Sequence, residues 1–172
     1  MTTTCYYYNP DGDMEILKLP KIESYPGVFF RKYTESPAEI EISKRLSLFP
    51  HSNCVQILNV NEDDHYVDME YLRTNTGHPD TKSIQDALNH FHSIGIVYID
   101  IKRDNIGYSE SDRTYKFFDF DMSGVVDVFH PHEWFIPPVE GYLFKKAKEI
   151  IPNVNLLYDY DTTIFQCLYK RI

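Results

Sequence analysis

Three segments with strand-like composition open the sequence, and no helix pattern interrupts them. Residues 4–8 and 14–18 flank residues 9–13, Asn-Pro-Asp-Gly-Asp, in which each position favours a turn. A hairpin of two antiparallel strands is therefore expected at the start of the chain. Residues 28–33 follow the turn signal Tyr-Pro-Gly at residues 25–27 and predict a third strand. The chain is thus constrained to begin as a β-sheet.

A helix is expected directly after this sheet segment, because Ser36 suits the N-cap and Pro37 the first helical position. One face of the segment that follows is apolar, at Ile42, Leu46 and Phe49. Residues 55–60 and 65–72 predict two more strands, and residues 81–94 predict an amphipathic helix. This order predicts an α+β fold, with a small antiparallel sheet carrying one helix, followed by a mostly helical half.

Length and charge narrow the class of protein. A chain of 172 residues suits a single domain. Residues 1–72 are called its first part below and residues 73–172 its second part, a division that follows from the family resemblance described at the end of this section. Lys and Arg number 17 against 26 Asp and Glu, and the net charge of −9 argues against nucleic acid or an anionic membrane as partner.

The sequence also predicts where the protein acts. We expect no signal peptide and no apolar stretch of the roughly 18 residues that a membrane span requires. Cys5, Cys54 and Cys167 are widely spaced and odd in number, which favours a reducing compartment and no zinc site. A cytoplasmic, intracellular protein is therefore expected.

An acid-rich segment at residues 97–121 contains the residues best suited to chemistry. Asp100 and Asn105 follow the predicted helix, and Asp119 follows a strand-like run at residues 115–118. Carboxylate and amide oxygens are the ligands that Mg²⁺ with bound phosphates prefers. Lys102 would add positive charge beside a phosphoryl group. Taken singly, each of these acids could equally be an ordinary loop residue that caps a turn.

Taken together, these residues resemble the catalytic core of the eukaryotic-type protein kinases. Residues 98–105, Tyr-Ile-Asp-Ile-Lys-Arg-Asp-Asn, are similar to the family's H-R-D-L-x-x-x-N, and residues 119–121, Asp-Phe-Asp, are similar to its D-F-G. Residues 88–97 resemble the family's helix before that loop, and residues 65–72 its fifth strand and hinge. The similarity runs in order over residues 28–125. It implies a two-lobed kinase-like fold in which the second lobe is reduced.

The resemblance implies a role for each matching residue. Asp100 would orient the substrate hydroxyl or accept its proton, and Lys102 would steady the transferring phosphate. Asn105 and Asp119 would hold Mg²⁺. These roles suit phosphoryl transfer, which depends chiefly on positioning and charge neutralisation.

ATP would be bound by residues of the first part. The resemblance places a gatekeeper and an adenine-binding hinge at Met69, Glu70, Tyr71 and Leu72. It also requires a strand Lys paired with a helix Glu, for which we expect Lys32 and Glu39, because Glu39 shares a helical face with the apolar residues and Glu41 does not. Arg31 and Lys18 are alternatives to Lys32, which could also be a solvated strand residue.

Several features depart from that family. Gly12 is the sole glycine before residue 27, so the G-x-G-x-x-G motif is absent and we expect a reduced or missing phosphate-covering loop and a weaker affinity for nucleotide. Asp121 replaces the glycine of D-F-G. Ile99 replaces an Arg that commonly pairs with a phosphorylated residue, and Ser123 is the one hydroxyl side chain in residues 119–137. We therefore expect activity that is constitutive or controlled by a partner.

The end of the sequence is short for a kinase. Residues 137–140, Pro-Pro-Val-Glu, stand where the family has A-P-E, and residues 159–168 resemble a buried helix whose Asp braces the catalytic loop. We expect Asp159 rather than Asp161 to be that brace. The helices that usually dock protein substrates are expected to be absent, so substrate recognition would come from elsewhere.

The expected function is ATP-dependent phosphoryl transfer to Ser or Thr hydroxyls of a protein substrate. The first alternative is a pseudokinase, a module that binds a partner protein and regulates or competes with another kinase. A less favoured alternative is a small-molecule phosphotransferase of similar fold. So compact a chain would suit a large DNA virus acting in its host cell.

Overall fold

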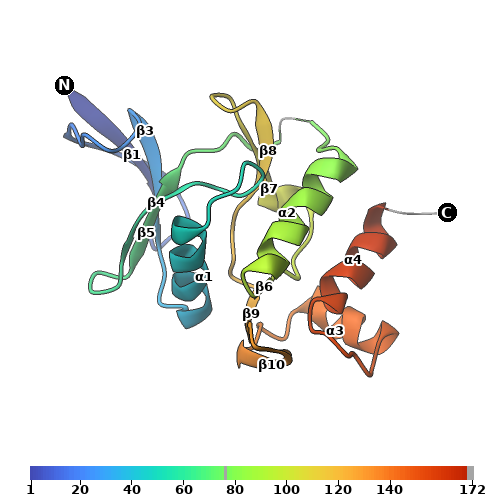
Figure 1. Cartoon of the computed structure of the whole chain (residues 1–172). Coiled ribbons are helices and arrows are strands. Elements are labelled where there is room, and N and C mark those ends of the chain that lie inside the picture. The colour runs from blue at the N-terminus through green and yellow to red at the C-terminus, as the bar shows by residue number, and fades with distance from the viewer. Residues whose placement is uncertain (76, 170–172) are drawn as a thin grey trace.

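The computed structural model describes residues 1–75 and 77–169, which form an α+β fold with a sheet on one side and most of the helices on the other (Figure 1). The sheet strands are β1 (Thr2–Tyr8), β2 (Met14–Pro20), β3 (Val28–Tyr33), β4 (Ile57–Asn61) and β5 (Tyr66–Glu70). The predicted α+β class is thus confirmed, and each predicted strand of the first part is present within a few residues of its expected bounds.

The first sheet has the strand order β2-β1-β3-β5-β4. The predicted hairpin is confirmed: β1 and β2 pair in antiparallel fashion, and Asn9 Oδ1 accepts the N–H groups of Asp11 and Asp13, each at 3.0 Å. The prediction of a wholly antiparallel sheet is wrong, because β1 pairs with β3 in parallel. After β2 the chain crosses to the far side of β1, so β3 runs in the same direction as β1.

Helix α1 (Pro37–Leu48) begins as the sequence predicts. The N–H group of Glu39 donates to Ser36 Oγ at 3.2 Å, and the apolar face buries Ile42 and Leu46. Figure 1 shows α1 between the sheet and the second part of the chain. Any side chain on the inward face of α1 is therefore held at the junction of the two parts.

The second part contains more strand than expected. Its helices are α2 (Thr81–Ser93), η1 (Arg103–Asn105), α3 (Tyr142–Ile150) and α4 (Asp159–Tyr169). Its strands are β6 (Ile96–Val97), β7 (Ile106–Ser109), β8 (Thr114–Phe117), β9 (Gly124–Asp127) and β10 (His130–Ile136). They form a three-stranded sheet, β10-β9-β6, and a two-stranded one, β7-β8. The prediction that the second half is mostly helical is thus wrong in part. The helix predicted at residues 81–94 is confirmed as α2.

One hydrophobic core joins the two parts and places the acid-rich segment. The buried cluster extends from Ile42 in α1 to Phe165 in α4. At its centre the Phe91 ring stacks on Tyr98 at 5.3 Å and meets Phe120 edge-on at 5.9 Å. The residues that flank the acids are therefore fixed by aromatic packing. No helix in the described part of the chain has the length and apolar character of a membrane span.

Candidate functional site

Lys32 and Glu39 form the pair that the sequence suggests. Lys32 Nζ on β3 donates to Glu39 Oε2 on α1 at 2.6 Å, and Glu39 is only 1% exposed. The contact needs no long connection, because α1 starts soon after β3 and its first turn faces that strand. Glu41 is turned to Arg45, with Oε1 3.2 Å from the Arg45 Nε. Oε1 of Glu39 is buried and has no hydrogen-bond partner among the described residues.

The two alternatives to Lys32 have other partners. Lys18 Nζ on the exposed strand β2 donates to Thr4 Oγ1 at 2.8 Å. Arg31 is a neighbour of Lys32 on β3 and therefore points to the opposite face, where it makes a bidentate contact with Asp68 at 2.7 and 3.0 Å. Lys32 is thus the cation of the three that reaches the acid-rich segment.

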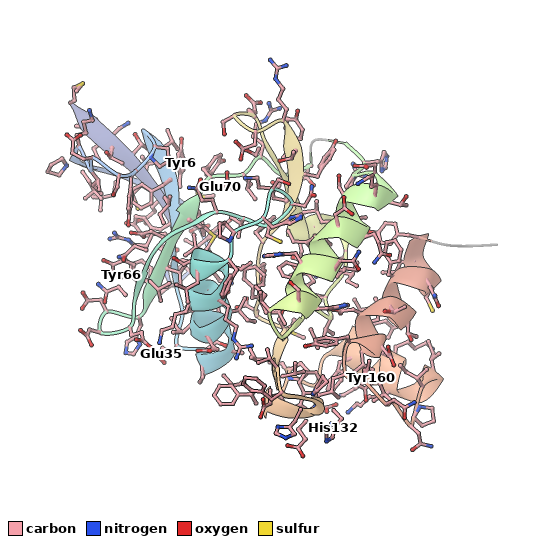
Figure 2. All side chains as sticks on the ribbon, in the orientation of Figure 1. Tyr6, Glu35, Tyr66, Glu70, His132 and Tyr160 are labelled. Atoms are coloured by element: carbon pink, nitrogen blue, oxygen red, sulfur yellow. The ribbon has the colours of Figure 1, made fainter. Side chains whose placement is uncertain are left out.

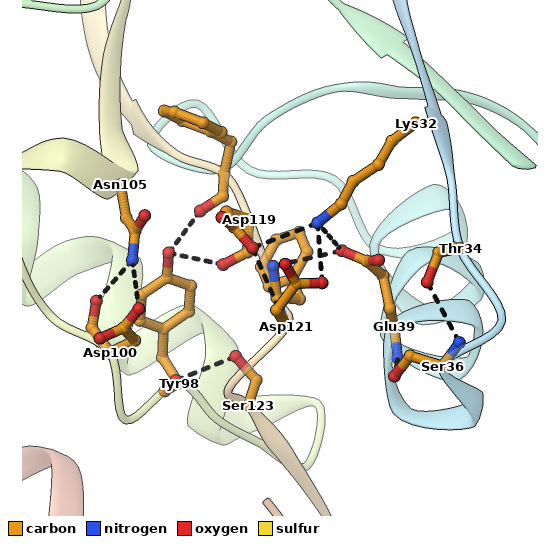
Figure 3. A network of polar contacts seen from close by, with 12 residues as sticks. Lys32, Thr34, Ser36, Glu39, Tyr98, Asp100, Asn105, Asp119, Asp121 and Ser123 are labelled. Carbon is orange, nitrogen blue, oxygen red and sulfur yellow. Dashed lines mark hydrogen bonds and ion pairs between the residues drawn. The ribbon is translucent and has the colours of Figure 1, made fainter. Parts of the chain in front are cut away.

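Two acids of that segment complete a cluster around Lys32 (Figure 3). Asp119 Oδ1 lies 3.1 Å and Asp121 Oδ1 3.0 Å from Lys32 Nζ. Glu39, Asp119 and Asp121 each offer an oxygen within 4.8 Å of the others, a spacing at which carboxylates can share a cation. Lys32 bridges β3, α1 and the segment after β8, so one ammonium group links both parts of the chain.

Burial and charge act against each other in this cluster. Burial favours the neutral form of Lys32, but its three carboxylate neighbours outweigh that effect and raise the pKa of Lys32 above its ordinary value. Asp119 is also desolvated, yet the adjacent Lys32 ammonium lowers its pKa. Burial raises the pKa of Asp121, and the charges of Glu39 and Asp119 add to that effect. Asp119 is therefore the more firmly ionised of the two aspartates.

Asp100 and Asn105 meet on the loop before β7. Asn105 Nδ2 donates to the Asp100 carbonyl oxygen at 2.9 Å and to Asp100 Oδ2 at 2.8 Å. Asn105 is buried at the end of η1, whereas Asp100 is partly exposed and its carboxylate can reach solvent. Lys102 Nζ lies 3.6 Å from Asp100 Oδ2 with half of its side chain exposed. The three predicted loop residues are thus within contact of one another.

Tyr98 connects this loop to Asp119. Its buried hydroxyl group donates to the carbonyl oxygens of Phe118 and Asp119, the latter at 2.9 Å. Asp119 has a φ of 64° and Ile99 a φ of 68°, a left-handed conformation that residues other than glycine adopt at a cost. Ser123 is buried, and its Oγ donates to the Tyr98 carbonyl oxygen at 2.9 Å. Ser123 therefore holds the loop in place from inside the core.

The brace of the loop is Asp161, so the prediction of Asp159 is wrong. Asp161 is 0% exposed; its Oδ2 accepts the N–H group of Tyr98 at 2.8 Å and its Oδ1 accepts that of Ile99 at 2.7 Å. His92 Nε2 lies 2.8 Å from Oδ2. Asp159 is exposed at the first residue of α4. Helical periodicity contained the signal, because Asp161 is spaced three and four residues from the buried Ile164 and Phe165.

A pocket lies where β5 leaves the sheet. It has a volume of about 460 Å³, part of it open to solvent, and the predicted hinge residues line it. The full lining is Tyr8, Met14, Phe30, Val55, Met69, Glu70, Tyr71, Leu72, Thr74 and Phe118. Phe118 directly precedes Asp119, so the pocket and the acidic cluster are adjacent along the chain. The sequence did not predict the apolar walls that β1, β2 and β3 contribute. Their contribution depends on how the sheet folds over β5.

Glu70, labelled in Figure 2, lines this pocket, and its carboxylate is held by the protein itself. Glu70 Oε1 accepts the Gln56 N–H group at 2.7 Å and the buried Lys116 ammonium at 2.7 Å. The backbone N–H group of Glu70 is also occupied, because it donates to the Gln56 carbonyl oxygen at 3.0 Å. An adenine-binding role for the hinge residues stays a prediction. No known protein-family model matches the chain, and the resemblance to the kinases rests on the order and identity of these motifs.

Proposed function

We propose that the chain is a minimal protein kinase with a two-lobed fold that binds Mg-ATP and transfers the γ-phosphate to a Ser or Thr hydroxyl of a protein substrate. The observation that carries the proposal is the position of Lys32, whose ammonium contacts Glu39 on α1 and Asp119 from the second part of the chain. The three free cysteines agree with action in the reducing cytoplasm.

The residues suit each step of such a transfer. The pocket at Met69 and Leu72 is apolar enough for an adenine ring, and Lys32 supplies a cation for the phosphates. Asn105 and Asp119 offer the hard oxygen ligands that Mg²⁺ requires, and a bound Mg²⁺ would neutralise phosphate charge.

The chain's own residues can be given roles in the bond changes of the transfer. The substrate hydroxyl oxygen bonds to the γ-phosphorus as the bond to the β-phosphate oxygen breaks, and ADP leaves. The hydroxyl proton passes to the partly exposed Asp100 carboxylate, which Asn105 orients. Lys102 adds charge on the solvent side of Asp100.

A pseudokinase is the second candidate, and one observation favours it. Asp121 and Asp119 both contact Lys32, so the cation that phosphate would need is already shared among three carboxylates. The short turn between β1 and β2 also offers no glycine-rich cover for a nucleotide. In this case the chain would bind a partner protein without turnover.

Transfer of labelled γ-phosphate to a panel of proteins tests the proposal. Wild type is compared with Asp100→Ala and Asp119→Asn, and Asp104→Ala serves as the control because Asp104 is an exposed acid of the same loop. We expect loss of transfer in the first two variants only. Equal transfer in all four proteins would refute the assigned roles. A rise in melting temperature with Mg-ATP but no transfer would favour the pseudokinase.

A further inference from the structure

Arg45 joins the C-terminal half of α1 to the second part of the chain. Its Nη1 donates to the carbonyl oxygen of Ile94 at 2.9 Å and lies 3.5 Å from those of Gly95 and Val126. Ile94 and Gly95 directly follow α2, and Val126 lies on β9. One guanidinium group from α1 thus reaches backbone oxygens of two separate elements.

Gly95 creates the space for this contact. A Cβ atom at Gly95 would lie 2.4 Å from Arg45 Nη1 and 2.9 Å from Val128 Cγ1, so any larger residue would displace the guanidinium. The backbone bond from Val126 N–H to the Gly95 carbonyl oxygen, at 2.8 Å, brings the acceptors of both elements together. The carbonyl oxygens that face Arg45 are therefore held together by the backbone itself.

The chemistry of the contact favours a strong link. Carbonyl groups at the end of a helix have no partner within it and carry the negative end of its dipole. A guanidinium group is permanently charged, and its planar donors can serve several oxygens at once. Only 20% of the Arg45 side chain is exposed, so solvent weakens the contact little.

The link has a consequence for Glu39. Arg45 follows Glu39 by six residues on α1, or about 9 Å along the axis of one rigid helix. We propose that Arg45 is a positioning residue that fixes α1 against the second part of the chain, so that Glu39 holds Lys32 beside Asp119 before any partner binds. The catalytic part of this inference rests on the proposed kinase function. A link of this kind would hold the site assembled without phosphorylation. This agrees with the burial of Ser123 and with Ile99, whose side chain cannot pair with a phosphate.

Two measurements test this positioning role. The first is hydrogen exchange of the α1 amides, and the second is the KM for ATP against kcat. In Arg45→Ala we expect α1 amides to exchange at least about tenfold faster while those of α4 keep their rates, because no described residue of α4 accepts a hydrogen bond from Arg45. In the same variant the KM for ATP should rise roughly tenfold, with a smaller change in kcat. Arg45→Lys should restore part of the wild-type exchange rate and part of the wild-type KM. Lys44→Ala is the control, since Lys44 is a half-exposed cation of the same helix that pairs with Glu62.

The outcomes separate this inference from the proposed function. Wild-type exchange of α1 in Arg45→Ala, or equal effects in Lys44→Ala, would overturn the role of Arg45. If Arg45→Ala does not fold, Arg45→Gln replaces it, and unchanged α1 exchange in that variant would overturn the role equally. If wild type transfers no phosphate, the kinase proposal fails, and the exchange data still decide whether Arg45 fixes α1.

Discussion

The hydroxyl group of Tyr98 donates a hydrogen bond to the carbonyl oxygen of Asp119 at 2.9 Å. It also donates to the carbonyl oxygen of Phe118. Because Asp119 is held in a left-handed conformation, the direction of its carboxylate depends on these contacts. A buried tyrosine thus anchors the backbone that carries Asp119, while Lys32 contacts its carboxylate.

Replacing Tyr98 with Phe should release that backbone. The partly buried carbonyl oxygens of Phe118 and Asp119 would lose the hydroxyl proton that they share, and we expect the free energy of unfolding to fall by about 1 to 3 kcal/mol. Phosphoryl transfer should fall at saturating ATP, because Asp119 is no longer oriented. Urea unfolding and initial rates measure the two effects. Tyr108→Phe, at a half-buried tyrosine on β7, should change neither.

Asp161→Asn tests the brace of the loop. An amide offers one acceptor oxygen, so the N–H group of either Tyr98 or Ile99 would face a donor. We expect a loss of about 1 to 3 kcal/mol in unfolding free energy. Asp159→Asn, two residues earlier and exposed, should behave as wild type. If the Asp159 variant is the less stable of the two by thermal unfolding, the assignment of the brace is wrong.

Lys32→Met should destabilise the fold through Glu39. The carboxylate of Glu39 is 1% exposed and would lose its ion-pair partner, which typically costs about 3 kcal/mol or more. The double variant Lys32→Met with Glu39→Gln should recover much of this stability, because the buried side chain at position 39 is then uncharged. Neither variant should show a rise in melting temperature with Mg-ATP. Recovery of the nucleotide response in the double variant would count against a phosphate contact by Lys32.

Asp121→Asn should strengthen nucleotide binding. The change removes one of three carboxylates that share the Lys32 ammonium, and it keeps a side chain of the same size. We expect the Kd for ATP to fall roughly fivefold, as loss of one partly exposed charge contact of about 1 kcal/mol allows. Calorimetric titration measures this value, with Asp104→Asn as control. A weaker affinity would instead indicate that Asp121 assists the nucleotide or its metal.

His51 makes stability depend on pH. Burial lowers the pKa of His51 below its ordinary value of 6.5, and the nearby His90 adds to this effect whereas Asp86 opposes it. The neutral ring also accepts the Asn53 N–H group at Nδ1, at 3.0 Å. Acid therefore favours the unfolded chain, which binds the proton more tightly.

The free energy of unfolding should consequently fall as the pH drops below about 6.5 and should level off below the lowered pKa. Urea unfolding at about pH 7.5 and about pH 5.5 measures the difference. His51→Gln should reduce it, because the glutamine does not titrate. His132→Gln, at an exposed histidine, should leave it unchanged. An equal pH dependence in wild type and His51→Gln would contradict the prediction.

Local chemistry made the first part of the fold predictable. The hairpin turn around Asn9 and the cap at Ser36 are decided by neighbouring residues, and both form as expected. The parallel pairing of β1 with β3 and the three-stranded sheet of β6, β9 and β10 were not predicted. Strands as short as the two residues of β6 are stabilised by distant partners and not by their own composition.

The candidate site shows the same division. Lys32 and Glu39 are near in sequence, and a helical face was sufficient to choose Glu39 over Glu41. The contact of Asp121 with Lys32 spans 89 positions, so only the folded chain reveals it. Likewise the burial of Ser123 follows from its bond to Tyr98 and not from its position in a loop.

The link between the two parts is fixed at both of its ends. Lys116 on β8 binds the buried carboxylate of Glu70, and Arg73 exchanges backbone hydrogen bonds with Tyr108 on β7 at 3.1 and 2.8 Å. Only Tyr71 and Leu72 lie between these two attachments to a single hairpin. Rotation of one part against the other would break a buried ion pair, so the walls of the pocket keep their spacing. A ligand that fits it loses little affinity to reorganisation of the protein.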